Sequence, residues 1–246
     1  MNADQILRGG TGSGASGVDI GSRPLPRRVA VIGAAGGLGQ GILRVCRAEG
    51  IGFTAIVRSR PERITDVPHG SRVAVVTSLA DQDALTDAFS GAGAVLTALG
   101  VTSASSDDSA LLSRNTATVE ASMLAAGVDR FIVINTLIAS PPGAPVGRAV
   151  RFSSRIPGAI GRGVSEQQAV VESFGNGAFA SLRWTVVRAG VNSKGRNERP
   201  VAAADWNGAP NSWLPVSYDA MGRWMLEEAA ANDFVFAAPL VSRRRR

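Results

Sequence analysis

The sequence of 246 residues is poor in several residue types: it contains one cysteine, one tyrosine, one lysine and one histidine, and 5% aromatic residues. A lone cysteine, Cys46, cannot form an intramolecular disulfide, which argues against a disulfide-stapled secreted fold and for the cytoplasm. The lone histidine, His69, has no neighbouring cysteine or second histidine, so no metal site is expected. The longest apolar runs, near residues 94–101 and 131–139, fall short of the about 20 residues that span a bilayer, so no membrane partner is expected.

The formal net charge of +6 is carried by the two ends of the chain. Residues 1–28 hold four arginines against two acidic residues, and residues 243–246 are four arginines, whereas residues 29–242 hold 18 basic and 18 acidic side chains. Residues 9–22 are rich in glycine and serine and offer little apolar surface to bury. We therefore expect a flexible leader at residues 1–26, a neutral folded body and a basic tail at 243–246. A neutral body makes a nucleic-acid partner improbable.

Short β-branched runs alternate with longer amphipathic stretches through the body, residues 27–242. Strands are predicted at residues 28–32, 53–57, 72–77, 94–99, 130–135, 184–188 and 234–237. Helices are predicted after residue 36 and at residues 81–89, 109–126, 165–174 and 217–231. Because the strands are continuously apolar, they are expected to form a parallel α/β sheet covered on both faces, in a single domain with a small C-terminal substrate region.

Three glycines follow the first predicted strand and open the first helix. In this context Gly33 permits a tight turn, Gly36 lets the backbone approach a pyrophosphate, and Gly39 allows the helix to pack closely on the sheet. The helix N-terminus would present free N–H groups and a positive dipole end to the anion. The spacing predicts a Rossmann-like, doubly wound fold that binds a dinucleotide.

The end of the second predicted strand indicates which dinucleotide is bound. A chain that selects NAD has an acidic residue here for the ribose 2′-hydroxyl, but this strand is followed by Arg58, Ser59 and Arg60, with no acid before Glu62. Arginine suits a 2′-phosphate. We therefore predict NADP(H), with Arg58 as the main discriminator, Ser59 adding a hydroxyl, and Arg60 or Arg63 assisting. The alternative is a solvated basic loop.

The succession of segments VAVIGAAGGLG, VRSRPER, GAGAVLTALG, AGVDRFIVINT and WTVVRAG resembles the atypical short-chain dehydrogenase/reductase group. Within that group the sequence is most similar to NmrA-like and NAD(P)H-binding proteins of the biliverdin reductase B (flavin reductase) type. The resemblance covers about residues 28–240. It specifies the fold and the dinucleotide more closely than the reaction.

The resemblance implies a role for each matching position. The pyrophosphate would be lined by Gly33, Ala35, Gly36, Gly37, Leu38 and Gly39, and the adenosine phosphate would meet Arg58 and Ser59. Where relatives carry a Gly-Asp-hydrophobic tripeptide, this chain has Thr77-Ser78-Leu79, so Ser78 and Leu79 would contact adenine without a carboxylate. The nicotinamide half would lie beside Ala98, Leu99, Gly100, Thr136 and Ala189; Ala189 belongs to an Arg-Pro-Gly position whose proline is missing here.

Chemistry at this site lacks its usual proton donor. A typical short-chain dehydrogenase uses Tyr-x-x-x-Lys, but the only tyrosine and lysine here, Tyr218 and Lys194, do not form that motif. Residues 165–168, where the pair would fall, read Ser-Glu-Gln-Gln. Thr136 is the candidate catalytic donor, and a strand-end hydroxyl satisfying local backbone is the alternative. Tyr218, near a predicted helix start, is interpreted as structural.

Two further features remain open. Arg148, Arg151, Arg155 and Arg162 follow one another without an intervening acid, and either form the rim of a site for an acidic substrate or a solvated helix face. Residues 205–215 include two tryptophans, and form either a lid or a loop packed on the core.

The leading hypothesis is an NADPH-dependent oxidoreductase that passes hydride to a small planar acceptor: a flavin, quinone, enone or ketone. The alternatives are an NmrA-like regulator that binds the dinucleotide without chemistry, and a non-redox cyclase or isomerase on the same fold. The oligomeric state stays open.

Overall fold

The computed structural model describes residues 25–100, 111–203 and 214–243. Its strands are β1 (Arg28–Ile32), β2 (Gly52–Val57), β3 (Arg72–Val75), β4 (Ala94–Thr97), β5 (Arg130–Thr136), β6 (Arg183–Ala189), β7 (Val191–Arg196), β8 (Val201–Ala203) and β9 (Leu240–Ser242). Its helices are α1 (Gly37–Glu49), α2 (Gln82–Phe89), α3 (Thr116–Ala125), α4 (Arg148–Ser153), α5 (Ala159–Gly175) and α6 (Tyr218–Ala231), with short 3₁₀ turns η1 (Pro61–Arg63) and η4 (Leu112–Arg114). No helix among these residues is both long and apolar enough to cross a membrane.

Eight strands form one sheet in the order β3-β2-β1-β4-β5-β6-β9-β8. Every pairing is parallel except that of β8 with β9. The order reverses between β1 and β4, which is the switch point of a doubly wound sheet, and ligands bind such sheets outside the carboxyl ends of the strands at that point. The predicted Rossmann-like α/β fold is confirmed.

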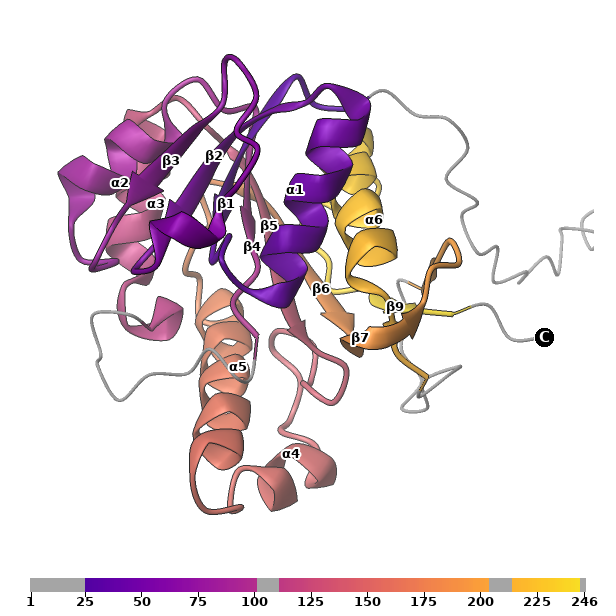
Figure 1. Cartoon of the computed structure of the whole chain (residues 1–246). Helices are drawn as coiled ribbons and strands as arrows, with labels where there is room; N and C mark the ends of the chain where they lie inside the picture. The colour runs from indigo at the N-terminus through magenta and orange to yellow at the C-terminus, as the bar shows by residue number, and fades with distance from the viewer. Residues whose placement is uncertain (1–24, 101–110, 204–213, 244–246) are drawn as a thin grey trace, which may run out of the picture.

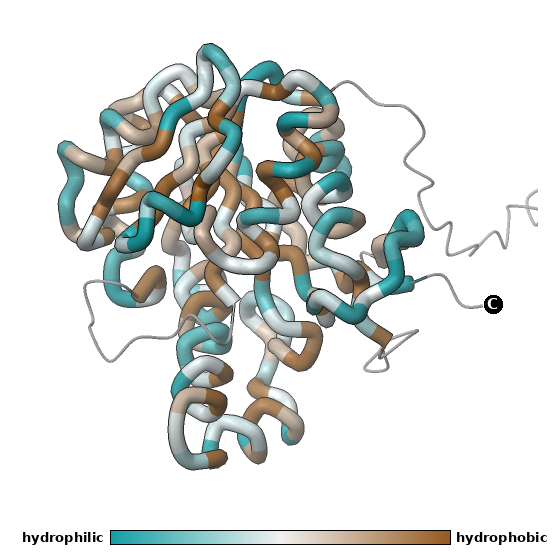
Figure 2. The backbone as a smooth tube through the Cα atoms, viewed as in Figure 1, coloured by the Kyte–Doolittle hydropathy of each residue, from teal (hydrophilic) through white to brown (hydrophobic). Residues whose placement is uncertain are grey.

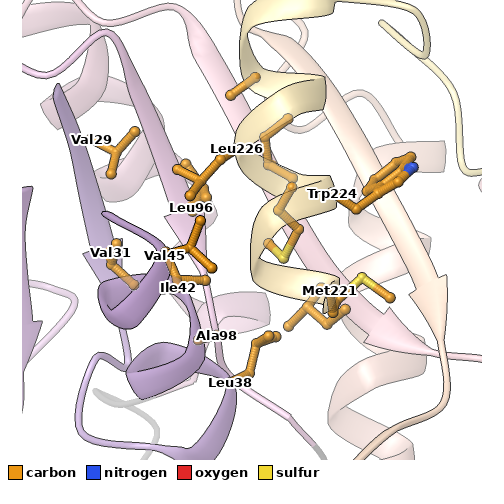
Figure 3. Close-up of a cluster of buried hydrophobic side chains, with 14 of the residues drawn as sticks. Val29, Val31, Leu38, Ile42, Val45, Leu96, Ala98, Met221, Trp224 and Leu226 are labelled. Carbon is orange, nitrogen blue, oxygen red and sulfur yellow. The ribbon is translucent and has the colours of Figure 1, made fainter. Parts of the chain in front are cut away.

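Helices cover both faces of the sheet, as Figure 1 shows. On one face α1 and α6 lie side by side and bury an apolar cluster that includes Leu38, Ile42, Met221 and Trp224 (Figure 3). On the other face α2, α3 and α5 bury a second cluster that contains Phe131 and Phe174. The apolar colour of the inner strands in Figure 2 follows from this double coverage, because a strand buried on both faces needs no polar alternation.

Cys46 lies in the first cluster and is fully buried, as the apolar stripe of α1 predicts. Burial raises the pKa of its thiol to about 12, so the group stays protonated and packs as a small apolar side chain.

The long helix predicted at residues 109–126 was wrong in its first part. Residues 109 and 110 lie outside the described residues, and Leu112–Arg114 form a 3₁₀ turn. The helix α3 begins after Asn115, whose backbone is not helical and whose side-chain Nδ2 donates to the Leu111 carbonyl at 2.7 Å. Asparagine breaks the helix here because its side chain competes for backbone groups.

Two other predicted boundaries differ. Of the strand predicted at residues 234–237, residues 234–236 form a turn in which Phe236 has a left-handed φ of 57°, and only Ala237 makes a single parallel bridge, to Thr185. The strand β9 begins only at Leu240. The helix α5 begins at Ala159, six residues before the predicted start at Ser165. Its first turns contain Gly161, where an added Cβ would lie 1.9 Å from the Ile156 carbonyl oxygen, so glycine is required by close packing.

The predicted leader and tail lie mostly outside the described residues, but their inner ends are ordered. Leu25 packs against the first apolar cluster. Arg243 forms an ion pair with Glu198 at 3.5 Å, and its side chain is 12% exposed. The flexible leader at residues 1–26 and the basic tail at 243–246 stay predictions.

A buried ion pair joins α6 to the amino end of β5, an interior strand of the sheet. Arg130 and Glu228, 1% and 0% exposed, meet at 2.8 Å, and Glu228 also accepts from the Phe234 N–H at 2.9 Å. Burial lowers the pKa of Arg130 to about 10 and raises the pKa of Glu228, while their mutual attraction opposes both shifts. Removing one member would leave the other as an uncompensated charge.

We expect Glu228→Ala to lower the free energy of unfolding by about 3–5 kcal/mol, because it strands the Arg130 guanidinium in the interior. Urea denaturation measures the change. Asp129→Ala, which breaks the exposed Arg183 pair, is the control and should cost less than about 1 kcal/mol. Equal losses in the two variants would contradict this account.

Candidate functional site

The glycine loop between β1 and α1 has the geometry that its sequence predicts at two positions. Gly33 has φ +80°, in the left-handed region that favours glycine. An added Cβ at Gly39 would lie 2.4 Å from the Gly33 carbonyl oxygen and 2.6 Å from Ala34 Cα. The absence of that Cβ lets the first turn of α1 sit directly against the loop.

The first turn of α1 has N–H groups available to a ligand. Its N-cap residue, Gly36, has no side chain that could accept from them, and the first backbone bond into the cap runs from the Gln40 N–H to the Gly36 carbonyl at 2.9 Å. The preceding N–H groups, of Gly37, Leu38 and Gly39, therefore lack an intrahelical acceptor. With the positive end of the helix dipole they form an arrangement suited to an anion.

Tyr218, interpreted from the sequence as structural, borders this loop. An added Cβ at Gly37 would lie 2.5 Å from the Tyr218 ring and 2.8 Å from its hydroxyl oxygen, and one at Gly41 would lie 2.6 Å from the Tyr218 carbonyl oxygen. Ser217 caps α6 by accepting from the Ala220 N–H at 3.1 Å. The start of α6 is thus held against the start of α1, which the sequence separates by 180 residues.

A cavity of about 520 Å³, here called the cleft, opens at the carboxyl ends of β1, β4, β5 and β6. The described residues that line it are Gly36, Gly37, Leu38, Ala98, Gly100, Ile134, Asn135, Thr136, Leu137, Gln167, Ala189, Gly190, Val191, Asn192, Pro215 and Tyr218. None of these carries a charged side chain. The cleft lies at the switch point of the sheet and has the size of a small-molecule site.

A chain of hydrogen bonds forms the floor of the cleft between β4 and β5. The Thr136 N–H donates to Asn135 Oδ1 at 2.8 Å, and Asn135 Nδ2 donates to the Gln167 carbonyl at 2.8 Å. Gln167 Nε2 in turn donates to the Leu99 carbonyl at 3.0 Å. Asn135 and Gln167 were missed as site residues; Asn135 was detectable as a polar residue in an otherwise apolar strand.

Arg188 fixes the backbone beside Ala189, the residue at which the family's proline is missing. Its guanidinium is fully buried and donates to the carbonyls of Ala238, at 2.8 Å, and Ala139, at 3.3 Å. Burial lowers its pKa to about 10. The side chain thereby connects the loop after β5 to the segment before β9, on either side of the strand end that carries Ala189.

At the end of β2, Arg58, Ser59 and Arg60 are exposed. Arg60 has a left-handed φ of 60° and begins η1. The loop is held to α1 by Gln40 Nε2, which donates to the Arg63 carbonyl at 3.0 Å. Within the described parts of the chain, Arg58 forms no ion pair or hydrogen bond, so its charge is available to an anion.

Ser78 and Leu79, predicted to contact adenine, follow β3. Ser78 Oγ accepts from the Ala80 N–H at 3.0 Å, which stabilises the turn. Leu79 is 7% exposed and packs in the second apolar cluster. Neither lines the cleft, and the structure places both at the neighbouring strand end.

The arginines at 148, 151, 155 and 162 are exposed on α4, α5 and the turn between them, and none is among the described residues that line the cleft.

Of the tryptophan-containing segment 205–215, residues 205–213 lie outside the described residues, and Pro215 lines the cleft. His69 is exposed. Within the described ranges, no three His, Cys, Asp or Glu side chains gather where they could hold a metal ion.

The glycine loop, the free first turn of α1 and the cleft at the switch point are the parts of a dinucleotide site. A family model described as NAD(P)H-binding matches residues 33–231, which span all three features. The chain belongs to this NAD(P)H-binding family. Its members bind a nicotinamide dinucleotide, so the predicted family and the predicted class of cofactor are confirmed. No curated protein sequence matches the chain.

Solved structures of low sequence identity share the fold. A Streptococcus pneumoniae protein provisionally named an NADH-flavin reductase is 20% identical, with a TM-score of 0.63, 89% of this chain and 100% of that chain being covered. The anaerobilin reductase ChuY from Escherichia coli O157:H7 is 18% identical, with a TM-score of 0.63 and coverage of 89% and 98%. A Bacteroides thetaiotaomicron protein provisionally named an epimerase is 18% identical, with a TM-score of 0.66 and coverage of 90% and 99%.

The residues predicted for the site of this NAD(P)H-binding protein fall into two groups. One group lines the cleft: Gly36, Gly37, Leu38, Ala98, Gly100, Thr136 and Ala189. Beside it, Gly33 and Ala35 lie in the loop, Gly39 in the first turn of α1, and Leu99 after β4. Arg58, Ser59, Ser78 and Leu79 lie apart, at the ends of β2 and β3. This separation is what an extended dinucleotide requires, since its adenosine and nicotinamide halves lie on opposite sides of the switch point.

We expect Gly37→Ala to destabilise the protein, because the new methyl group overlaps the Tyr218 ring. Adding Tyr218→Ala should recover part of the loss, giving a coupling energy of about 0.5–3 kcal/mol in a double-mutant cycle. Thermal unfolding of the four proteins measures it. Strictly additive effects would mean that the ring moves aside at no cost.

Proposed function

We propose that the protein is an NADPH-dependent reductase that transfers hydride to a small, neutral, planar acceptor such as a flavin, quinone, enone or ketone. The observation that carries the proposal is the uncharged cleft of about 520 Å³ at the end of the glycine loop, with Arg58 exposed at the neighbouring strand end. The reductases among the structural neighbours support it by analogy of fold. We also propose that it acts in the cytoplasm.

Binding is assigned residue by residue. The free N–H groups of Gly37, Leu38 and Gly39 would hold the pyrophosphate. Arg58, with Ser59 and either Arg60 or Arg63 assisting, would hold the 2′-phosphate through charge-assisted hydrogen bonds. Ser78 and Leu79 would border adenine. Ala98, Leu99, Gly100 and Ala189 would flank the nicotinamide half.

The acceptor would lie in the cleft beside Thr136. Bound NADPH supplies hydride from the nicotinamide ring. The cleft has no charged lining residue in the described chain, so it favours an acceptor without charge at its reacting end. The Thr136 hydroxyl, at the end of β5, would donate a hydrogen bond to the acceptor. Together with solvent it would complete the protonation of the acceptor.

We expect Arg58→Ala to raise the Kd for NADPH by about tenfold or more and to leave the Kd for NADH within about twofold, because only NADPH carries the 2′-phosphate. Isothermal titration of both nucleotides measures the change. Arg148→Ala removes another exposed arginine, far along the chain from β2, and it should alter neither value. A wild-type preference for NADH would overturn the assignment.

An NmrA-like regulator that binds the dinucleotide without chemistry is the second candidate. One observation favours it: among the described residues lining the cleft, the only hydroxyl groups are those of Thr136 and Tyr218, and there is no histidine, carboxylate or lysine. A non-redox enzyme such as a cyclase or isomerase is a third. NADPH consumption with a panel of flavins, quinones and enones separates these, since neither alternative should show turnover above background.

We expect Thr136→Val to lower kcat by about a hundredfold with an enone acceptor, since positioned proton donors contribute about 10²–10⁴. The Kd for NADPH should stay unchanged. Thr118→Val, on the α3 helix, is the control and should leave kcat unaffected. If the Thr136→Val variant keeps the full kcat, the Thr136 hydroxyl is not the proton donor and has only a local structural role.

A further inference from the structure

Gln167 has an unsatisfied acceptor at the cleft. Its side chain is 4% exposed, and Oε1 has no hydrogen-bond partner among the described residues. An amide oxygen withdrawn from water costs free energy unless a donor reaches it. Because Gln167 lines the ligand-sized cleft, a ligand bound there is a source for the missing donor.

The orientation of this amide is fixed by its surroundings. Nε2 donates to the Leu99 carbonyl at 3.0 Å, and exchanging the two ends would place Oε1 against that carbonyl oxygen, two acceptors facing each other. The backbone of Gln167 is held as well, since its carbonyl accepts from Asn135 Nδ2 at 2.8 Å. The free atom is therefore an acceptor and is held in place before any ligand binds.

The position of Gln167 in the cleft determines which part of a bound dinucleotide lies near its side chain. It lines the cleft together with Gly100 and Thr136, at the ends of β4 and β5, and lies on the far side of the switch point from Arg58. A dinucleotide whose pyrophosphate rests on the α1 N-terminus extends its nicotinamide riboside toward these strand ends. That half carries O–H donors on its ribose and N–H donors on its carboxamide.

We propose that Gln167 Oε1 accepts a hydrogen bond from a donor of the nicotinamide riboside half of the bound dinucleotide and so holds that half at the floor of the cleft. The proposal rests on the proposed function. In typical short-chain dehydrogenases the helix at this place carries the Tyr-x-x-x-Lys pair, whereas in this chain it would carry a neutral hydrogen-bond acceptor. It would orient the ring without supplying a charge.

A bound water is the competing partner. A second, small cavity of about 20 Å³ borders Gln167, Thr97 and Glu166, and a cavity of this size can hold one water. Thr97 Oγ1 is also buried without a partner in the described chain. If a water satisfies Oε1 in both the free and the bound protein, nucleotide affinity does not depend on Gln167, and the two explanations give different titrations.

The test is Gln167→Met, which keeps the length of the side chain and removes the acceptor. Three probes are titrated into the full chain: NADPH, its 3-acetylpyridine analogue, and adenosine 2′,5′-bisphosphate, which lacks the nicotinamide riboside. The variant should bind NADPH about tenfold more weakly and the bisphosphate with unchanged affinity. Unchanged bisphosphate binding also shows that the variant is folded, because a general structural defect would weaken both.

The analogue identifies the donor. It keeps the ribose hydroxyls but replaces the carboxamide with an acetyl group, so equal affinity of wild type and variant for it assigns the bond to the carboxamide N–H, whereas the full tenfold loss assigns it to the ribose. Gln168→Met is the matched control. Gln168 is the next residue on α5 and also buried, but it accepts from the Ser140 N–H, contacts Glu172, and is not part of the cleft lining.

Two results would overturn the inference. If Gln167→Met binds NADPH as the wild type does, Oε1 has no ligand donor, and the proposed function stands without this contact. If the wild type binds neither NADPH nor the bisphosphate, the proposed function fails and the inference fails with it. An affinity loss for NADPH that Gln168→Met reproduces would assign the effect to the packing of α5.

Discussion

The contact between the first turn of α1 and the loop that follows β1 is the constraint on which the site depends. Gly39 has no Cβ, and one placed there would lie 2.4 Å from the Gly33 oxygen. Without this close approach, the N-terminus of α1 could not point across the end of the strand. The free N–H groups of its first turn, and with them the place of any anion, follow from this one packing contact.

The same end of the sheet is completed by elements that come late in the chain. The helix α6 lies against α1, and Tyr218 occupies the space that the missing Cβ of Gly37 leaves. Arg188 and the Asn135–Gln167–Leu99 hydrogen bonds fix the ends of β6, β5 and β4. A rigid floor of this kind suits hydride transfer, because the reacting groups must be held in a narrow range of geometry.

Charge is distributed so that the cleft stays neutral. Exposed arginines lie at the end of β2 and on α4 and α5, and the buried Arg130–Glu228 pair lies at the opposite, amino end of β5. The described lining of the cleft contributes only polar and apolar side chains. In the proposed complex, the negative charges of the dinucleotide would meet the helix end and Arg58, while the cleft lining would remain uncharged.

Local patterns in the sequence were sufficient for the strands β1 to β6 in their order, the glycine loop and the arginine at the end of β2, but not for α4. These features arise from short-range rules: strand periodicity, the conformational freedom of Gly33, and an apolar stripe on α1. The short-range rules failed where the backbone conformation of single residues or one close packing contact decides, because strand and helix periodicity does not encode either. The extended start of α5 depends on Gly161 packing against the Ile156 carbonyl, and the turn at residues 234–236 depends on left-handed Phe236.

The sequence by itself therefore determined the fold class, through the alternation of strands and helices, and the dinucleotide-binding family, through the glycine loop between β1 and α1. Only the tertiary structure decided which polar groups face the cleft. Gln167, Asn135 and Tyr218 come from three elements and lie up to 83 positions apart in the sequence. No sequence pattern marks these three residues as functional. Their meeting at one strand edge follows from the parallel sheet, in which the carboxyl ends of all neighbouring strands lie together.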